Sequence, residues 1–227
     1  IWNDHSDSMS QRDSGWIQLF AETNQEACDL HIQAFRIAEE MSLPVMVCMD
    51  GFVLTHAFER MDIPEQSEVD AYLPPYEPRQ ELDPDHPYSI GSMVGPEAFT
   101  EVRWLAHRRM LDAIPAIEAA SREFEARFGR ASGGLVSEYR MEDAEVAVLA
   151  MGSMLGTIKD TVDEMREKGA KIGVVSLKCY RPFPYEAVRR ALQRARTVLV
   201  MERMVSVGTG GALELDVMKA LRGLPIE

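Results

Sequence analysis

The last third of the sequence constrains the fold most, because apolar runs of strand length alternate there with helical patterns. The apolar runs are Val146–Met151, Ile172–Leu177 and Thr197–Met201. The helical patterns end at Gly169, Ala195 and Leu221. Strands and helices that alternate with short connections are typical of a doubly wound domain with a parallel sheet. The sequence therefore predicts an α/β fold for this region.

A shorter α/β pattern opens the chain. Trp16–Phe20 has the pattern of a strand, and Thr23 with Glu26 forms a capping box that begins a helix over about Asn24–Met41. Val45–Met49 is a continuous apolar run of strand length. Strands that are buried on both faces have this pattern, which together with the preceding helix predicts a second parallel sheet.

Between the two patterns the composition changes. Prolines recur among acidic residues from position 59 to position 96, which predicts an extended linker lying against a surface, with one short helix near Glu65–Leu73. Glu97–Phe128 is the longest helical pattern, and Pro115 inside it predicts a kink or two separate helices. The expected units are therefore residues 1–58, a linker at 59–96, a connecting helix at 97–130 and a second domain at 131–227.

Charge and cysteine content exclude several classes of function. The chain has 24 Lys and Arg against 37 Asp and Glu, a net charge of −13 that argues against nucleic acid and anionic membrane surfaces as partners. Its apolar runs are far shorter than the roughly 20 residues that a membrane-spanning helix needs. The three cysteines are widely spaced, which disfavours a disulfide framework or a metal or iron–sulfur site built from this chain alone. Reduced thiols and the lack of a signal peptide predict the cytoplasm.

The first segment is the densest in groups that can take part in chemistry. His5 lies between Asp4 and Asp7, so these side chains could form an acid–base group or a weak metal site. The alternative is a polar loop in which Asp and Ser side chains cap neighbouring backbone. Arg12 could clamp the carboxylate of a substrate or partner, or it could form an internal ion pair with Asp13.

Two glycine-containing turns resemble nucleotide or nucleophile motifs without matching them. Gly208–Gly211 precedes a helix, but its spacing fits neither the dinucleotide fingerprint nor the P-loop, so a tight turn is expected. In Gly152–Gly156 the glycines are not placed two before and two after Ser153, which excludes a nucleophile elbow.

The first segment and others along the chain resemble the α-subunit of pyruvate:ferredoxin oxidoreductase and its 2-oxoacid relatives. The likeness spans essentially the whole sequence. The similar stretches are Asp4–Asp7, Arg12–Trp16, Gln18–Glu22, Leu43–Phe52, Leu73–Tyr76, Glu138–Tyr139, Glu142–Glu145, Gly152–Ser153 and Arg181–Pro184.

The resemblance implies the end of a pyrimidine-type thiamine-diphosphate domain at residues 1–58. A transketolase C-terminal-like domain would follow at residues 131–227, with both ends of the chain cut. It implies oxidative decarboxylation of a 2-oxoacid such as pyruvate to an acyl-CoA, with electrons passed to ferredoxin or flavodoxin. Thiamine diphosphate with Mg would be shared with a partner β-subunit, while γ- and ferredoxin-like δ-subunits complete the complex. Iron–sulfur clusters and CoA would be held outside this chain.

The resemblance also limits the site residues. The family's glutamate that activates the cofactor and its substrate-binding threonine and arginine lie before this sequence begins. Asp4, His5, Asp7 and Arg12 match the segment just beyond that arginine, which implies positioning near the active-site cleft rather than covalent chemistry. Two alternatives stay open. Lys178–Pro182 also resembles the β-chain of thiamine-dependent 2-oxoacid dehydrogenases, and the polypeptide alone could be a non-catalytic structural module.

Overall fold

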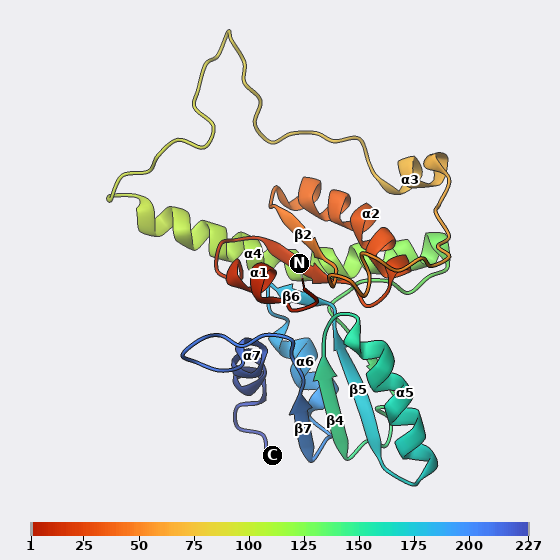
Figure 1. Ribbon diagram of the computed structural model, residues 1–227. Helices are drawn as coiled ribbons and strands as arrows, with labels where there is room; N and C mark the ends of the chain where they lie inside the picture. The colour runs from red at the N-terminus through yellow and green to blue at the C-terminus, as the bar shows by residue number, and fades with distance from the viewer. Residues whose placement is uncertain (1, 227) are drawn as a thin grey trace.

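The N-terminal unit is a three-stranded sheet with strand order β2-β1-β6 (Figure 1). In this computed structural model, which describes residues 2–226, β1 (Ile17–Phe20) runs parallel to β2 (Val45–Cys48), and β6 (Cys179–Arg181) joins β1 antiparallel. The short helix α1 (Ser6–Ser10) precedes β1. Helix α2 (Asn24–Met41) connects β1 to β2. It begins where the hydroxyl of Thr23 accepts a hydrogen bond from the Glu26 amide at 3.1 Å.

The C-terminal unit is a four-stranded sheet with strand order β3-β5-β4-β7. Strand β4 (Val146–Ala150) runs parallel to both β5 (Ile172–Leu177) and β7 (Thr197–Val200). The edge strand β3 (Val136–Tyr139) is antiparallel to β5, a common departure in otherwise parallel sheets. The connecting helices are α5 (Met154–Glu167), α6 (Tyr185–Leu192) and α7 (Ala212–Leu221).

Helices cover both faces of this second sheet, which confirms the doubly wound prediction. Successive residues of a strand point to opposite faces. Val148 on β4 therefore packs in one buried cluster with Leu155 and Val162 of α5. Its neighbour Leu149 packs in another cluster that contains Leu192 of α6 and residues of α7.

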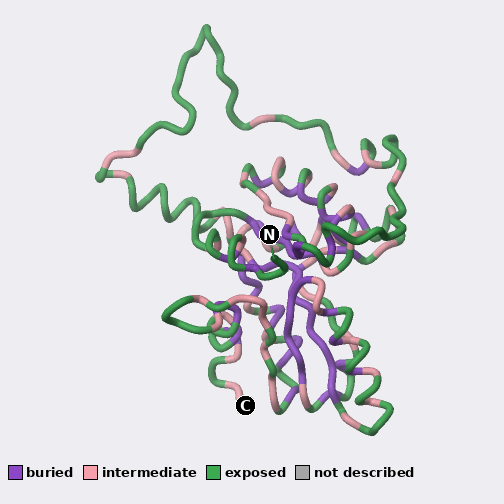
Figure 2. The backbone as a smooth tube through the Cα atoms, in the orientation of Figure 1, coloured by how far each residue is buried: buried purple, intermediate pink, exposed green. Residues whose placement is uncertain are grey.

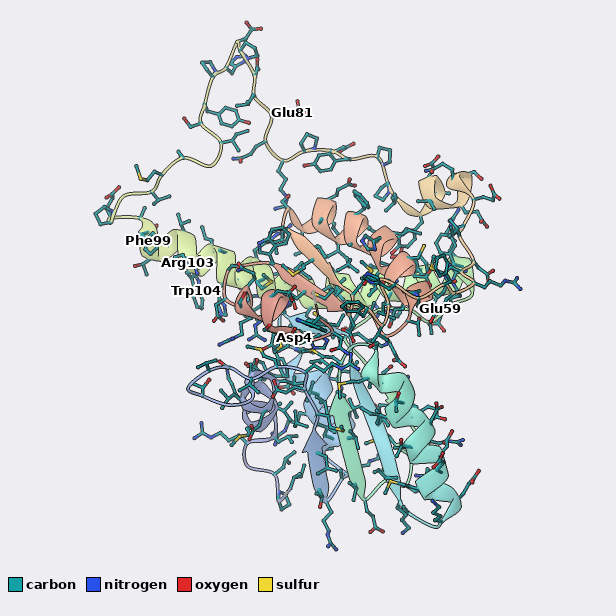
Figure 3. All side chains as sticks on the ribbon, viewed as in Figure 1. Asp4, Glu59, Glu81, Phe99, Arg103 and Trp104 are labelled. Carbon is teal, nitrogen blue, oxygen red and sulfur yellow. The ribbon has the colours of Figure 1, made fainter. Side chains whose placement is uncertain are left out.

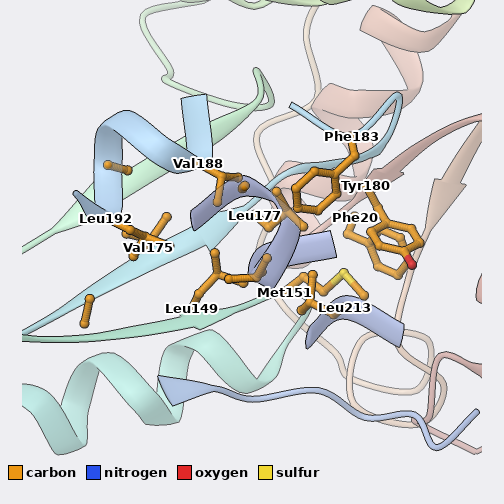
Figure 4. Close-up of a cluster of buried hydrophobic side chains, with 14 of the residues drawn as sticks. Phe20, Leu149, Met151, Val175, Leu177, Tyr180, Phe183, Val188, Leu192 and Leu213 are labelled. Carbon is orange, nitrogen blue, oxygen red and sulfur yellow. The ribbon is translucent and has the colours of Figure 1, made fainter. Parts of the chain in front are cut away.

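The two units share a hydrophobic core. Strand β5 continues through the single residue Lys178 into β6, which belongs to the other sheet. Phe20 of β1 packs in the same buried cluster as Leu177, Tyr180 and Phe183 (Figure 4). The carboxyl ends of β4 and β5 are therefore directed at the first sheet rather than at solvent.

The linker leaves the body of the protein. Helix α3 (Gln66–Tyr72) is anchored where the hydroxyl of the buried Tyr72 donates to the Ala120 carbonyl at 2.8 Å. Residues 74–98 then form an arm that projects outward and is mostly exposed (Figures 1 and 2). The prediction that the whole linker lies against a surface is wrong, because the side chains of Tyr76 and Tyr88 are 57% and 47% exposed.

Helix α4 (Phe99–Phe128) is one helix of 30 residues. The alternative of two separate helices is therefore wrong. Pro115 sits on the exposed side, whereas Ala113 and Ile117 beside it are buried in the core formed with α2 and β1. Burial on both sides of the proline keeps the two halves joined in one helix. Among residues 2–226, no helix combines the length and apolarity that crossing a membrane requires.

Candidate functional site

The candidate site lies where the carboxyl ends of β2, β4 and β7 meet. Ligands of open α/β sheets bind at this edge, where polar side chains follow the strands. Here the N-terminal segment covers the edge, because the backbone amide of His5 donates to the Arg203 carbonyl at 2.9 Å. Met9 of α1 is fully buried and anchors the same segment in the shared core.

A buried hydrogen bond joins His5 to Asp50. The two side chains are 4% and 1% exposed, and His5 Nε2 lies 2.6 Å from Asp50 Oδ1. Because an ionised carboxylate only accepts hydrogen bonds, Nε2 carries the proton of this contact. His5 Nδ1 is buried and has no hydrogen-bond partner among the described residues. A histidine oriented by a carboxylate through one nitrogen, with its other nitrogen unpaired, is suited to proton transfer.

The other oxygen of Asp50 connects the site to the C-terminal unit. Asp50 Oδ2 accepts from the Ser153 amide at 2.7 Å, the Ser153 hydroxyl at 2.5 Å and Arg203 Nη1 at 2.8 Å. Burial raises the pKa of Asp50, but hydrogen bonds from His5 and Ser153 outweigh it and hold the pKa below its ordinary value of 3.8. Asp50 is therefore ionised at neutral pH.

Glycine at position 152 is required by this arrangement. Gly152 has φ +79°, a conformation that glycine adopts readily. A Cβ atom there would lie 2.9 Å from both carboxylate oxygens of Asp50 and from His5 Nε2. The Gly152-Ser153 pair therefore lets the start of α5 approach the Asp50 carboxylate closely.

A cavity of about 510 Å³ lies beside His5. Its lining includes Asp4, His5, Asp7 and Asp50, together with Trp2, Ser8 and Thr55. The lining contains no lysine or arginine, so it does not suit a diphosphate group. This cavity therefore does not supply cationic groups that would bind the phosphates of a cofactor.

The structure brings three of the four sequence-predicted residues together and leaves one apart. Asp4, His5 and Asp7 line the same cavity, whereas Arg12 lies at another cavity beside α4 and α7. Of the two alternatives for this segment, the structure does not show the group of His5 with its flanking carboxylates, because the partner of His5 is Asp50, 45 residues away.

Asp4 and Asp7 bond to local serines instead. Asp4 accepts from the hydroxyl and amide of Ser6, and these bonds lower its pKa. Asp7 accepts from the Ser8 amide at 2.6 Å. Both acids therefore act as local caps, as the polar-loop alternative predicts. Among the described residues, no group of three potential ligands could hold a metal ion.

Sequence reasoning missed Asp50, Gly152, Ser153 and Arg203 as members of this site. The available signal was position, because Asp50 and Gly152 each follow an apolar strand run directly. The sequence does not show that these two strand ends face each other across two sheets.

The turn before α7 does not offer a phosphate site. The carboxylate of Glu202 accepts from the amides of Ala212, Leu213 and Glu214 at 3.0–3.2 Å. Because these amides are already bonded to an acidic group, the N-terminus of α7 is not available to an anion. The expectation of a simple turn at Gly208–Gly211 agrees with this geometry.

The two buried thiols are poor nucleophiles and poor ligands. Burial raises the pKa of Cys48 to about 12 and raises that of Cys179 as well. Cys28 is partly exposed and also has a raised pKa, caused mainly by burial. All three cysteines are free.

Comparison with known proteins identifies the family of the two units. Residues 1–122 match the family model "Pyruvate flavodoxin/ferredoxin oxidoreductase, thiamine diP-bdg", and residues 144–226 match "Pyruvate:ferredoxin oxidoreductase core domain II". Among solved structures, a 2-oxoglutarate:ferredoxin oxidoreductase from Magnetococcus marinus has a similar fold. Its TM-score is 0.53 at 14% identity, covering 93% of this chain and 38% of that one.

Curated relatives are similar along nearly all of the chain. The pyruvate synthase subunit PorA of Methanosarcina barkeri is 46% identical over 224 residues, covering 97% of this chain and 56% of the relative. PorA of Methanothermobacter thermautotrophicus is 43% identical, with 98% and 58% covered. The ketoisovalerate oxidoreductase subunit VorA of Pyrococcus abyssi is 35% identical, with 97% and 56% covered.

The chain thus spans little more than half the length of these relatives. The thiamine-diphosphate-binding model alone matches more than half of the chain. This chain therefore belongs to the pyruvate flavodoxin/ferredoxin oxidoreductase family.

Proposed function

We propose that the protein is the α-type subunit of a pyruvate:ferredoxin oxidoreductase, or pyruvate synthase. The enzyme would convert pyruvate and CoA to acetyl-CoA and CO₂ and pass two electrons to ferredoxin or flavodoxin, or run in reverse. One observation carries the proposal: the chain is 41–46% identical to pyruvate synthase subunits and only 34–35% identical to ketoisovalerate oxidoreductase subunits.

The domain organisation follows from the same proposal. Residues 1–58 would complete the pyrimidine-type domain, residues 59–96 and 97–130 would be linker and connecting helix, and residues 131–227 would form the transketolase C-terminal-like domain. The two sheets and the exposed arm between them support this division. Strand β6 crosses from the second domain into the first sheet, so the two domains would not separate freely.

Thiamine diphosphate with Mg would be held jointly with a β-subunit. The lining of the cavity beside His5 contains no lysine or arginine, so the diphosphate would need cationic ligands from elsewhere. Asp4, His5 and Asp7 would border the active-site cleft and position neighbouring groups, and Arg12 would lie farther out. Iron–sulfur clusters and CoA would be held by other subunits, including γ- and ferredoxin-like δ-subunits, in a cytoplasmic complex.

The assembly can be tested by anaerobic purification of the full-length protein through an affinity tag. We expect brown iron–sulfur subunits to co-purify and bound thiamine diphosphate to be released on denaturation. A colourless preparation whose partner is a lipoyl-bearing acyltransferase would replace the proposal with a 2-oxoacid dehydrogenase. A protein that purifies without any partner or cofactor would support a purely structural module.

A further inference from the structure

A second cavity, of about 410 Å³, lies between the loop after α1, the first half of α4, the turn after β6 and helix α7. Residues from all four segments line it, so it exists only in the folded protein. Its walls are apolar at Met110, Leu111 and Phe183. A cavity of this size can hold a small organic molecule.

The polar lining of this cavity is mainly cationic. Arg12, Arg103, Arg181 and Lys219 face only two acids, Asp13 and Asp216, in a chain whose net charge is −13. Cations gathered in a concave site raise the local concentration of anions, even on an acidic protein.

Internal ion pairs involve two of these four cations, Arg181 and Arg12. Asp216 is held by Arg181 at 2.9 Å and by the hydroxyl of Tyr185 at 3.1 Å, so this carboxylate is already satisfied. Arg12 Nε lies 3.6 Å from Asp13, whose side chain is 81% exposed. An exposed pair of this kind contributes little to stability, and a stronger anion can displace it.

Arg103 and Lys219 make no side-chain hydrogen bond or ion pair with any residue between 2 and 226. Lys219 lies 4.4 Å from the ring of Tyr185, which supports it from one side and leaves its ammonium donors available. Arg103 and Lys219 thus line the cavity without an internal carboxylate to neutralise them, and Arg12 adds a third positive charge whose carboxylate partner, Asp13, is exposed.

We propose that this cavity binds a small organic anion. A phosphate or carboxylate group lies at the rim formed by Arg12, Arg103 and Lys219, and the apolar part of the ligand packs against Met110, Leu111 and Phe183. Guanidinium groups bind both kinds of anion through paired hydrogen bonds. The inference does not rest on the proposed function, since it uses only the charges and shape of this cavity.

The test uses the purified full-length protein with any subunits that co-purify, and its methionine methyl groups are labelled for NMR. Met110 is the methionine that lines this cavity, and Met165 on α5 serves as a distant reporter. Phenyl phosphate and benzoate are the anionic probes, and benzyl alcohol is the neutral control. We expect a saturable shift of the Met110 signal with at least one anion, weakened by added NaCl because the attraction is electrostatic. The tighter of the two anions identifies phosphate or carboxylate as the preferred group.

Matched variants locate the binding. Arg12→Gln and Arg103→Gln should each weaken binding roughly tenfold or more, since each removes a charge-assisted hydrogen bond. Arg108→Gln, on the same helix but outside the cavity, should leave the affinity unchanged. The proposal is overturned if neither anion gives a saturable Met110 shift, if benzyl alcohol binds as tightly, or if both cavity variants bind like the wild type. Equal melting temperatures of the variants show that a loss of binding is not a loss of folding.

Discussion

Asp50 is the residue through which the two units contact each other most closely at the candidate site. Its two oxygens bind His5 of the N-terminal segment and Ser153 and Arg203 of the C-terminal unit. Buried charges need such partners, because an uncompensated charge in the interior is costly. The carboxylate therefore ties the orientation of His5 to the position of the second sheet.

The Asp50 pair makes stability depend on acid pH. Because folding lowers the pKa of Asp50, its contribution to stability is present above about pH 4 and is lost as the pH falls through the lower, folded pKa. Asp50→Asn removes this contribution and should destabilise the protein by about 3 kcal/mol at pH 7. Urea unfolding between pH 7 and pH 3 should show a weaker pH dependence for Asp50→Asn than for the wild type. Asp13→Asn, at an exposed site, should behave like the wild type, and an identical pH profile for Asp50→Asn would contradict the assignment.

Gly152 offers a second test at the residue scale. Gly152→Ala places a methyl group against Asp50 and His5 at positive φ, and it should lower the unfolding free energy by about 2–3 kcal/mol. Gly156→Ala lies inside helix α5 with no atom within 4 Å of the new Cβ, so it should be neutral or stabilising by up to about 1 kcal/mol. Thermal unfolding of both variants checks the pair, and equal effects would refute the close approach at Gly152.

Single residues were the least predictable part of the molecule. The sequence singles out His5 because acids flank it, yet the flanking Asp4 and Asp7 bond to nearby serines and the true partner is distant. Side-chain partners across two sheets depend on how the sheets pack, and no local pattern encodes this packing. The position of Asp50 directly after an apolar strand run was a usable signal for a site residue, but it does not predict that His5 is its partner.

At the scale of elements, the direct passage from β5 to β6 joins the two sheets through Lys178. Lys178 Nζ lies 3.0 Å from Glu22 and 2.8 Å from Glu26, and the three side chains are 8–10% exposed. Lys159 also reaches Glu22, which makes a buried network at the start of α2. The link is thus held by charge as well as by strand pairing.

Lys178→Met should therefore be strongly destabilising. It leaves two carboxylates close together and partly unpaired, which costs about 3–5 kcal/mol for a buried pair. Lys171→Met removes an exposed pair with Glu145, in which both side chains are 57% exposed, and should cost less than about 1 kcal/mol. Urea unfolding distinguishes the two variants, and a Lys178→Met protein as stable as Lys171→Met would show that the network is dispensable.

Elements marked by caps, helical periodicity or continuous apolar runs followed from the sequence, while β3 and β6 did not. The helix Asn24–Met41 and the strand Ile172–Leu177 coincide with their predictions, because caps and continuous apolar runs mark them. Strand β6 has three residues and strand β3 has two polar residues among four, so neither has a recognisable pattern. Both form because neighbouring strands offer them hydrogen bonds. Helix α4 stays continuous through Pro115 because the core holds its two sides.

At the scale of the whole molecule, the exposed arm and the two sheets differ in how firmly they are held by the rest of the protein. Residues 74–98 contact little of the body, whereas β6 and α4 bind the N-terminal unit to the rest of the chain (Figure 3 shows Glu81 on the arm and Phe99 where the helix begins). A cut in the linker should therefore leave the fold assembled.

Limited trypsin digestion of the purified protein tests this architecture. Arg60 and Arg79 are exposed in irregular backbone, so we expect the first cuts after them. The pieces should elute together in gel filtration and separate only in denaturant, because β1 stays paired with β6. First cuts within α5 or α7, or pieces that separate without denaturant, would contradict this picture.

Substrate kinetics tests the proposed pyruvate oxidation most directly. The measurement is CoA-dependent reduction of methyl viologen by the anaerobically purified full-length complex, with pyruvate and 3-methyl-2-oxobutanoate compared by kcat/KM. We expect reduction with pyruvate and a kcat/KM for pyruvate roughly tenfold or more above that for 3-methyl-2-oxobutanoate, because a substrate pocket that fits a methyl group would exclude a branched chain. A preference for the branched acid, or no CoA-dependent reduction with either acid, would contradict the proposal.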